Sequence, residues 1–290
     1  GNIYRANILY ATNKGAVGAG LVVGWTGEVT ILENIFDGNK GTSAYGLAQG
    51  GGLCVSDQDI SGYGRKMIVK NRFLNNRLTR ADNWRCGAGI LLFKTLATLN
   101  ANEIVGNTAN GSGAGVLAYM SSFRFENNII AHNVTTGWGG GVDVDRGPQS
   151  GTEQLMVNNT ITGNRAITYG GGLNVGNGAN VIVLNNILWA DTAQNGSELS
   201  VSGSTANVHY CDIQGGWSGG TGNINVDPQF RDSAYRLANT SGCLQRGIDS
   251  VQLDGAWYKA PPYCIYGMPR PSPAGTRTDI DASESDYLVV

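Results

Sequence analysis

Charged residues, histidines and long apolar runs are all scarce in this chain of 290 residues. Only 14% of the residues are charged and the formal net charge is −2, so no basic surface indicates nucleic-acid binding. The apolar runs fall far short of the about 20 residues that a membrane-spanning helix needs. The 2 histidines stand in no motif with a nucleophile and an acid, and no phosphate-binding loop opens a helix. We therefore expect neither nucleic acid nor membrane insertion.

Cysteine is also rare, and the count of 5 is odd. Cys54, Cys86 and Cys211 are scattered, and none of them has the spacing of a zinc ligand. Cys243 and Cys264 lie closer together in a proline-rich tail and could pair. We expect buried or free thiols, with Cys243–Cys264 as the one candidate disulfide. Such a bridge would fit an exported protein.

Glycine is the residue in excess, at 44 of 290 residues, which is about twice its usual share of roughly 7%. Asparagine is abundant too. The glycine spacing is not the strict three of collagen, and with 41% hydrophobic residues the chain is not a disordered linker. Glycine and asparagine both tolerate a positive φ angle. A chain rich in both is expected to make many tight corners.

Those corners recur as an internal repeat. The pattern N-x-[IFL]-x-x-[N/D] begins six times at intervals of 26 to 37 residues, and a fainter copy begins at Asn7. Its first positions are Asn34, Asn71, Asn102, Asn128, Asn159 and Asn186. A glycine cluster follows each marker in phase, as in "GGGLCV" at 50–55, "GAGILL" at 87–92, "GGGVDV" at 139–144 and "GGGLNV" at 170–175. Each unit therefore holds three extended pieces: one before the marker, one after it and one after the glycines.

Three short strands per repeat, with no helical pattern between them, predict the coils of a parallel β-helix. The fold class is all-β: a right-handed, single-stranded parallel β-helix of about eight coils, with an irregular C-terminal cap. Like strands then stack about 4.8 Å apart. We expect the marker asparagines to form a ladder along the axis and to take the left-handed conformation themselves. In "GGGVDVD", Val142 and Val144 point inward, while Asp143 and Asp145 point outward.

The coil pattern and the chain's end resemble the pectate-lyase-like superfamily of right-handed β-helices, above all its bacterial exported subgroup. The tail carries that subgroup's closing steps in "NVDPQF", "YGMPRP" and "TDIDAS", with Asp281 where the subgroup has glycine and Ser283 where it has an aromatic residue. The resemblance implies a protein that is secreted or at the cell surface. Six of the seven prolines lie beyond residue 227. We predict a β-helix over 1–227, a cap packed on the last coil over 228–290, and an N-terminal domain or second subunit covering the first coil.

In pectate-lyase-like proteins the binding groove crosses the strands that here follow the glycine clusters. The outward residues of these strands are predicted to form an apolar and aromatic shelf of Leu91, Phe93, Leu117 and Tyr119, with Asn174 farther along the axis. Trp138 and Tyr169 occupy the same offset in adjacent coils and should stack. Longer corners bring Trp84 and Arg85 toward the same rim. We therefore predict that Phe93, Tyr119, Trp84, Arg85, Trp138, Tyr169 and Asn174 bind substrate.

Asp143 and Asp145 are the predicted catalytic carboxylates. Two residues apart on one strand face, their Cα atoms should lie about 6.5–7 Å apart. They could hold Ca²⁺, or could act as acid and base on a glycosidic bond. In the calcium-dependent lyases of the superfamily a nearby Arg or Lys takes the proton, and the resemblance gives that role to Arg146, with Lys94 as an alternative. The opposing interpretation is a solvated pair that prevents lateral aggregation.

Two functions follow from these expectations. The leading hypothesis is an exported protein that recognises a polysaccharide by stacking sugars on aromatic rings, with cleavage by lyase or glycoside hydrolase chemistry as an additional step left open. The alternative is a non-catalytic surface or adhesin-type module, whose coil is a rigid spacer that presents its loops. No cofactor other than Ca²⁺ is expected.

Overall fold

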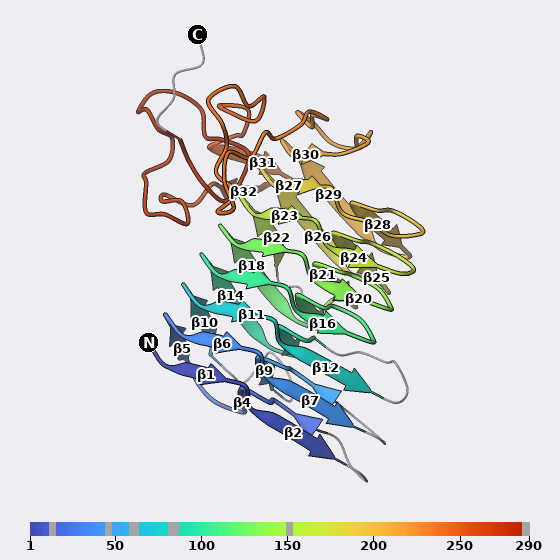
Figure 1. The fold of residues 1–290 in the computed structure, drawn as a ribbon. Coiled ribbons are helices and arrows are strands. Elements are labelled where there is room, and N and C mark those ends of the chain that lie inside the picture. Colours follow the sequence, from blue (N-terminus) through green and yellow to red (C-terminus); the bar gives the residue numbers. More distant parts are fainter. Residues whose placement is uncertain (12–15, 44–47, 58–63, 81–86, 149–152, 286–290) are drawn as a thin grey trace.

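The protein is a right-handed parallel β-helix whose coils stack along one axis (Figure 1). The structure is a computed structural model that describes residues 1–11, 16–43, 48–57, 64–80, 87–148 and 153–285. Four parallel sheets run along the stack, and successive coils supply their successive strands. Eight coils can be followed through the described residues, and the last holds only two strands. The predicted fold class is confirmed.

The first and second sheets lie on either side of the marker asparagines. The first sheet contains β5 (Val29–Leu32), β10 (Lys66–Val69), β14 (Leu96–Asn100), β18 (Ser122–Glu126), β22 (Gln154–Val157), β26 (Asn180–Leu184) and β29 (Thr205–His209). The second contains β1 (Ile3–Arg5), β6 (Ile35–Asp37), β11 (Arg72–Leu74), β15 (Glu103–Val105), β19 (Ile129–Ala131), β23 (Thr160–Thr162), β27 (Ile187–Trp189) and β30 (Asp212–Ile213).

The third sheet is a short strand per coil that the sequence pattern did not predict. It contains β2 (Ile8–Ala11), β7 (Lys40–Ser43), β12 (Arg77–Arg80), β16 (Thr108–Ala109), β20 (Val134–Thr135) and β24 (Arg165–Ala166). The fourth sheet follows the glycines and contains β4 (Leu21–Gly24), β9 (Leu53–Ser56), β13 (Ile90–Phe93), β17 (Val116–Tyr119), β21 (Val142–Asp145), β25 (Leu173–Gly176) and β28 (Leu199–Ser202). A small pair, β3 (Ala16–Val17) and β8 (Ala48–Gln49), lies between them in sequence.

Two asparagine ladders, rather than one, mark the corners of the second sheet. In the first ladder, Asn128 Oδ1 accepts from the backbone N (3.0 Å) and Nδ2 (2.9 Å) of Asn102. Asn128 Nδ2 donates to Asn159 Oδ1 and to the Leu99 carbonyl, each at 2.9 Å. The second ladder repeats this geometry five residues later in each coil, through Asn7, Asn39, Asn76, Asn107, Asn133, Asn164 and Asp191. Asn7 thus belongs to the second ladder, and Asn2 is the marker of the first coil.

The residue before each ladder position, and not the ladder asparagine itself, adopts the left-handed conformation. Asn127 (φ 55°) precedes Asn128, and His132 (φ 54°) precedes Asn133. This corrects the expectation that the marker asparagines are left-handed. The left-handed residue turns the chain, and the next side chain can then point inward into the ladder.

The three glycines of a cluster answer three different steric demands, as 139–141 show. Gly139 has a left-handed φ of 62°, and a Cβ there would lie 2.5 Å from the Cβ of Asp143. A Cβ at Gly140 would lie 2.5 Å from a carbonyl oxygen of the next coil. A Cβ at Gly141 would face the interior, 3.0 Å from Asn164 Nδ2. The third position of the cluster is therefore the inner wall of the second ladder.

The interior is filled by apolar columns that run along the axis, and the fourth sheet supplies two of them. Val142, Val144, Ile130 and Met156 are fully buried in one continuous cluster, as the alternation predicts. Aromatic rings stack along the axis at the N-terminal end, where Tyr4 lies 4.8 Å from Phe36 and Phe36 lies 4.7 Å from Phe73. The first coil is open on its outer side, and Ile3, Ile8 and Trp25 are all more than half exposed. An occupant of that end stays a prediction.

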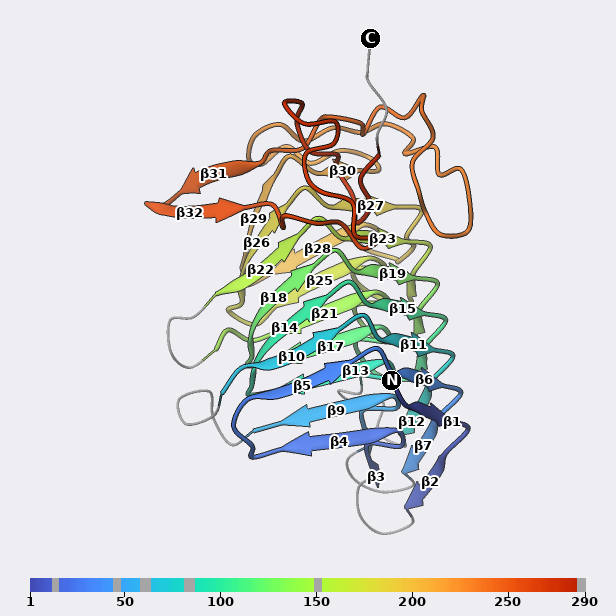
Figure 2. The same ribbon diagram turned by 90° about the vertical axis from the view of Figure 1, so that its left-hand side faces the viewer.

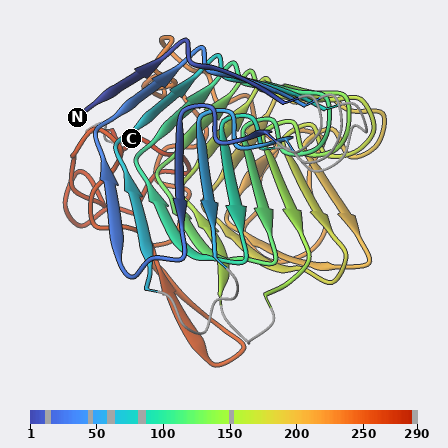
Figure 3. The same cartoon turned by 90° about the horizontal axis from the view of Figure 1, so that it is seen from below.

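The C-terminal segment covers the end of the stack and also runs along its flank (Figures 1 and 2). Asn158 Nδ2 donates to the carbonyls of Asp279 and Asp281, each at 3.1 Å, and Asn185 Nδ2 donates to that of Ile248 at 2.9 Å. A hairpin of β31 (Ser250–Leu253) and β32 (Ala256–Lys259) projects beyond the outline of the coils (Figure 3). The boundary at residue 227 stays a prediction.

The proposed Cys243–Cys264 disulfide is not formed. Cys54, Cys211, Cys243 and Cys264 are all free and buried, and Cys86 lies outside the described residues. Cys243 Sγ instead donates to Asp212 Oδ2 at 3.2 Å. The thiols therefore give no support to an exported location. Within the described ranges, no helix is long and apolar enough to cross a bilayer.

Candidate functional site

The outward leucines in the middle of the fourth sheet are covered rather than exposed. Leu91 and Leu117 are at most 1% exposed, and they pack with Cys54 and Tyr119 in a second apolar cluster outside the coil. The left-handed first glycine of each corner folds back over the first outward residue, so that a Cβ at Gly113 would lie 2.7 Å from Leu117 Cβ. Leu91, Phe93, Leu117 and Tyr119 therefore pack together outside the coil, as strand alternation predicts. They do not form an open shelf, because all but Phe93 are buried and the glycine corner shields the leucines.

Phe93 and Tyr119 nevertheless form a row along the axis. Their rings stack with centroids 5.2 Å apart. Lys94 Nζ lies 5.6 Å from the Phe93 centroid, and the guanidinium of Arg146 lies 5.8 Å from that of Tyr119. Phe93 is half-buried and Tyr119 is 9% exposed, whereas Arg146 faces solvent. The accessible surface here is therefore shared by the two cations and the half-buried Phe93 ring, and each cation lies over an aromatic ring.

Asp143 and Asp145 lie on the outer face, yet they are only 1% and 3% exposed. Asp143 Oδ1 accepts from Asn174 Nδ2 at 2.8 Å, and Asp145 Oδ1 accepts from Asn177 Nδ2 at 2.6 Å. Both Asp residues make further interactions. Accessible carboxylates were expected, and the burial contradicts this. Their visible effect is to orient two amides of the next coil.

This donor set does not match a calcium site. Ca²⁺ takes six to eight oxygen ligands, whereas each of these carboxylates already accepts an amide hydrogen bond and is closed off from water. Among the residues described, no group of three or more His, Cys, Asp or Glu could hold a metal ion. The pair is therefore not assigned a calcium ion.

Three of the predicted substrate-binding residues line one pocket of about 270 Å³. Trp138 and Tyr169 form its rim, joined by a parallel bridge between adjacent coils, and they are 40% and 44% exposed. Its other lining residues include Asn174, Asn177 and Ser202. Asp143 and Asp145 lie beside these amides on the adjacent strand β21 and hold both of them. Trp84 and Arg85 lie outside the described residues.

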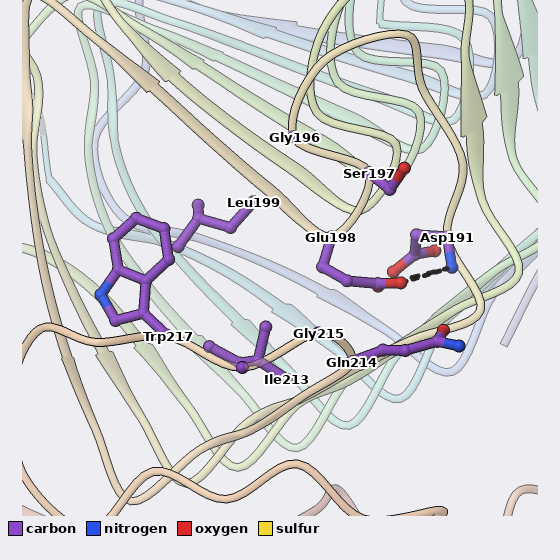
Figure 4. A pocket seen from close by; sticks show the side chains of 10 residues that line it. Asp191, Gly196, Ser197, Glu198, Leu199, Ile213, Gln214, Gly215 and Trp217 are labelled. Carbon is purple, nitrogen blue, oxygen red and sulfur yellow. Dashed lines mark hydrogen bonds between the residues drawn. The ribbon is translucent and has the colours of Figure 1, made fainter.

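A second pocket, of about 410 Å³, lies at the end of the stack and was missed from the sequence (Figure 4). It is lined by Asp191, Glu198, Leu199, Gln214 and Trp217, among others. The carboxyl groups of Asp191 and Glu198 turn toward each other in Figure 4. Burial and the neighbouring Glu198 raise the pKa of Asp191 well above its ordinary value. Burial raises the pKa of Glu198 to about 7. The sequence does hint at this pocket: Asp191 stands at the second-ladder position, where every earlier coil has asparagine.

Comparison with known proteins gives no relative. No family model matches the sequence, and no curated protein and no solved structure matches it.

Proposed function

We propose that this protein binds an extended polysaccharide along the outer side of its fourth sheet, with Trp138 and Tyr169 as stacking platforms. The observation that carries the proposal is the lining of one pocket: two half-exposed aromatic rings in adjacent coils, together with amides fixed by buried carboxylates. Sugar faces stack on such rings, and sugar hydroxyls pair with amides and serine hydroxyls.

The repeat of the fold suits a repeating ligand. Neighbouring coils lie about 4.8 Å apart, so that equivalent side chains recur along the axis. From the pocket, the surface continues over Arg146 and Lys94, which lie on the aromatic row of Tyr119 and Phe93. An elongated chain could contact the platforms, the amides and the cations at once. A small ligand would use only the pocket.

We further propose that the protein is exported, that it is related to the pectate-lyase-like proteins, and that it cleaves the bound polysaccharide. Arg146 is the exposed cation nearest in sequence to Asp145 and the candidate proton acceptor for a lyase reaction. Asp143 and Asp145 would first have to be uncovered to act on a glycosidic bond, because the glycine corner and the amides of the next coil enclose them. We therefore give them positioning roles in binding.

The test is binding of the purified chain to a panel of neutral and uronate-containing polysaccharides, by isothermal titration. Trp138→Ala and Tyr169→Ala should each weaken binding at least tenfold, about 1.4 kcal/mol. Trp257→Ala is the matched control, since Trp257 is 63% exposed on the hairpin and lies outside the pocket. Equal affinities for the parent and both pocket variants on every glycan bound would overturn the proposal.

The same incubations separate cleavage from binding. Unsaturated ends would identify a lyase, and reducing ends without unsaturation a hydrolase. The alternative, an adhesin-type spacer, is favoured by the projecting hairpin with its exposed Trp257. If no glycan binds, and surface binding depends on Trp257 instead, the spacer interpretation replaces ours.

A further inference from the structure

The second asparagine ladder ends on a carboxyl group in the place of an amide. In five coils the ladder Nδ2 donates to a carbonyl of an earlier coil, as Asn164 Nδ2 does to Ile130 O at 2.9 Å. For Asp191, the same register gives the carbonyl of Ile161. Asp191 Oδ1 accepts from the backbone N and Nδ2 of Asn164, at 2.6 and 2.9 Å. Oδ2 is therefore left in the donor's position.

Contacts with the glycine corner confirm that placement. A Cβ at Gly89, Gly115 or Gly141 would lie 3.0 to 3.1 Å from the Nδ2 of the ladder asparagine. At Gly172, the equivalent position, the atom met at 2.5 Å is Asp191 Oδ2. That oxygen is buried and accepts no hydrogen bond from the described residues. An ionised Oδ2 would face a carbonyl oxygen, whereas a protonated one supplies the missing donor.

Glu198 stands where the next coil's ladder residue would be. The backbone N of Asp191 donates to Glu198 Oε1 at 3.2 Å, as the N of Asn164 does to Asp191. The first ladder ends in a comparable way: Asn186 N donates to Cys211 Sγ, and Cys211 N donates to Asn223 Oδ1. There the substitute is an amide, which needs no proton. In the second ladder the substitute is a second acid.

We propose that Asp191 and Glu198 form a proton-holding pair that ends the second ladder and locks the corner 191–199 onto the last coils. One proton on the pair supplies the donor that asparagine supplies elsewhere. Loss of that proton places two carboxylates against each other and against a carbonyl oxygen, so the corner and the pocket beside it loosen. The fold thereby carries a pH-sensitive latch at its C-terminal end.

The charges around the pair reinforce this behaviour. From β30, Asp212 acts on Glu198 and raises its pKa, and Asp227 acts in turn on Asp212. Gln214 is uncharged, and its Oε1 accepts from Ala190 N at 2.8 Å. Arg165, which follows the ladder residue Asn164 in β24, is exposed to solvent. The pair thus sits among acids, which favours keeping its proton.

The sign of the pH dependence follows from the raised pKa values. Between the ordinary carboxyl range near 4 and the folded values, the folded chain binds more protons than the unfolded chain. The stabilisation is therefore complete at low pH and is lost as pH rises above the ordinary carboxyl range, through about 7 for Glu198, and the raised pKa of Asp191 acts in the same direction. An ordinary ion-paired carboxylate would behave in the opposite way.

The decisive variant is Asp191→Asn, which gives the last coil the ladder's usual donor at every pH. The difference in unfolding midpoint, variant minus parent, should be small near about pH 5 and should grow to several degrees by about pH 8, at roughly 2–4 °C per kcal/mol. Glu198→Gln should flatten the parent's pH profile in the same window. Asp254→Asn is the control for net charge, because Asp254 is exposed in the hairpin turn.

Infrared difference spectra test the proton directly and do not need a stability measurement. At neutral pH the parent should show a protonated carboxyl band that is missing from Asp191→Asn; the difference is needed because burial also raises the pKa of Asp281. If Asp191→Asn does not fold, Glu198→Gln and the parent's own spectrum still decide. Parallel pH profiles in parent and both variants, or no carboxylic acid band assigned to the pair, would overturn the latch.

Discussion

At the scale of single residues, asparagine serves this fold in two separate ways. A ladder residue such as Asn128 points inward and satisfies buried backbone groups of two neighbouring coils. The residue before it, such as Asn127, turns the chain with a positive φ. Other residues take that turning position elsewhere, including Glu33 and Lys70, but every inward position of the first ladder before Cys211 is asparagine. The inward hydrogen bonds are therefore the stricter demand.

Asn128→Val should destabilise the protein by at least about 2 kcal/mol, because Asn102 N loses its acceptor and the Leu99 carbonyl loses its donor in a buried site. Backbone strain does not contribute, since Asn128 is not left-handed. Chemical denaturation measures the loss. Asn207→Val, in a half-buried strand position outside both ladders, is the control. Equal midpoints for the two variants would contradict the ladder's energetic role.

At the scale of elements, the doubled asparagines that end on a first-ladder residue mark where the C-terminal segment binds. These pairs stand at 127–128, 158–159 and 185–186, and the first member of each donates to the segment. The fourth "NN", at 75–76, ends on a second-ladder residue, and Asn75 Nδ2 donates to Asp37 Oδ1 instead. The turning residue therefore doubles as an anchor in these three coils. The pattern was visible in the sequence, but only the structure shows its partner carbonyls in Tyr263, Asp279, Asp281 and Ile248.

Asn158→Gly should cost about 1–3 kcal/mol, because glycine keeps the left-handed turn but leaves the carbonyls of Asp279 and Asp281 without their donor. Limited proteolysis of the C-terminal segment should accelerate as well. Ala101→Gly is the matched control. Ala101 holds the same turning position (φ 57°) two coils before Asn158. If both glycine variants behave alike, the anchoring role of the doubled asparagines fails.

The strands of the first, second and fourth sheets, the number of coils and the stacking of the marker asparagines could be predicted. Each of them follows from a fixed spacing between marker asparagines and glycine clusters in the sequence. The third sheet could not, since strands such as β16 and β20 have only two residues and show no alternation. The candidate site was only partly predictable. Adjacent offsets placed Trp138 beside Tyr169, whereas the covering of Leu117 and Asp143 depends on the direction in which a left-handed glycine turns. Burial by a folded-back corner leaves no periodic signal.

At the scale of the whole molecule, the stack is quasi-one-dimensional and its two ends are unequal. Each coil contacts mainly its neighbours, so local stability depends on how many neighbours a coil has. Coils near the C-terminal end are covered by the following segment, through clusters that join Ile129 with Ala282 and Leu155 with Ile248. The first coil has a neighbour on one side, and Ile3 and Ile8 are 62% and 76% exposed.

Native-state hydrogen exchange should therefore be graded along the axis. Amides of β1 and β2 should exchange orders of magnitude faster than those of β18 and β19, because opening the first coil breaks one set of ladder bonds and opening a middle coil breaks two. Tyr4→Ala removes the ring that stacks on Phe36 at 4.8 Å, so it should speed exchange in the first two coils and leave β19 unchanged. A uniform exchange rate along the stack, or an equal response of β19 to Tyr4→Ala, would show that the coils open only as one unit.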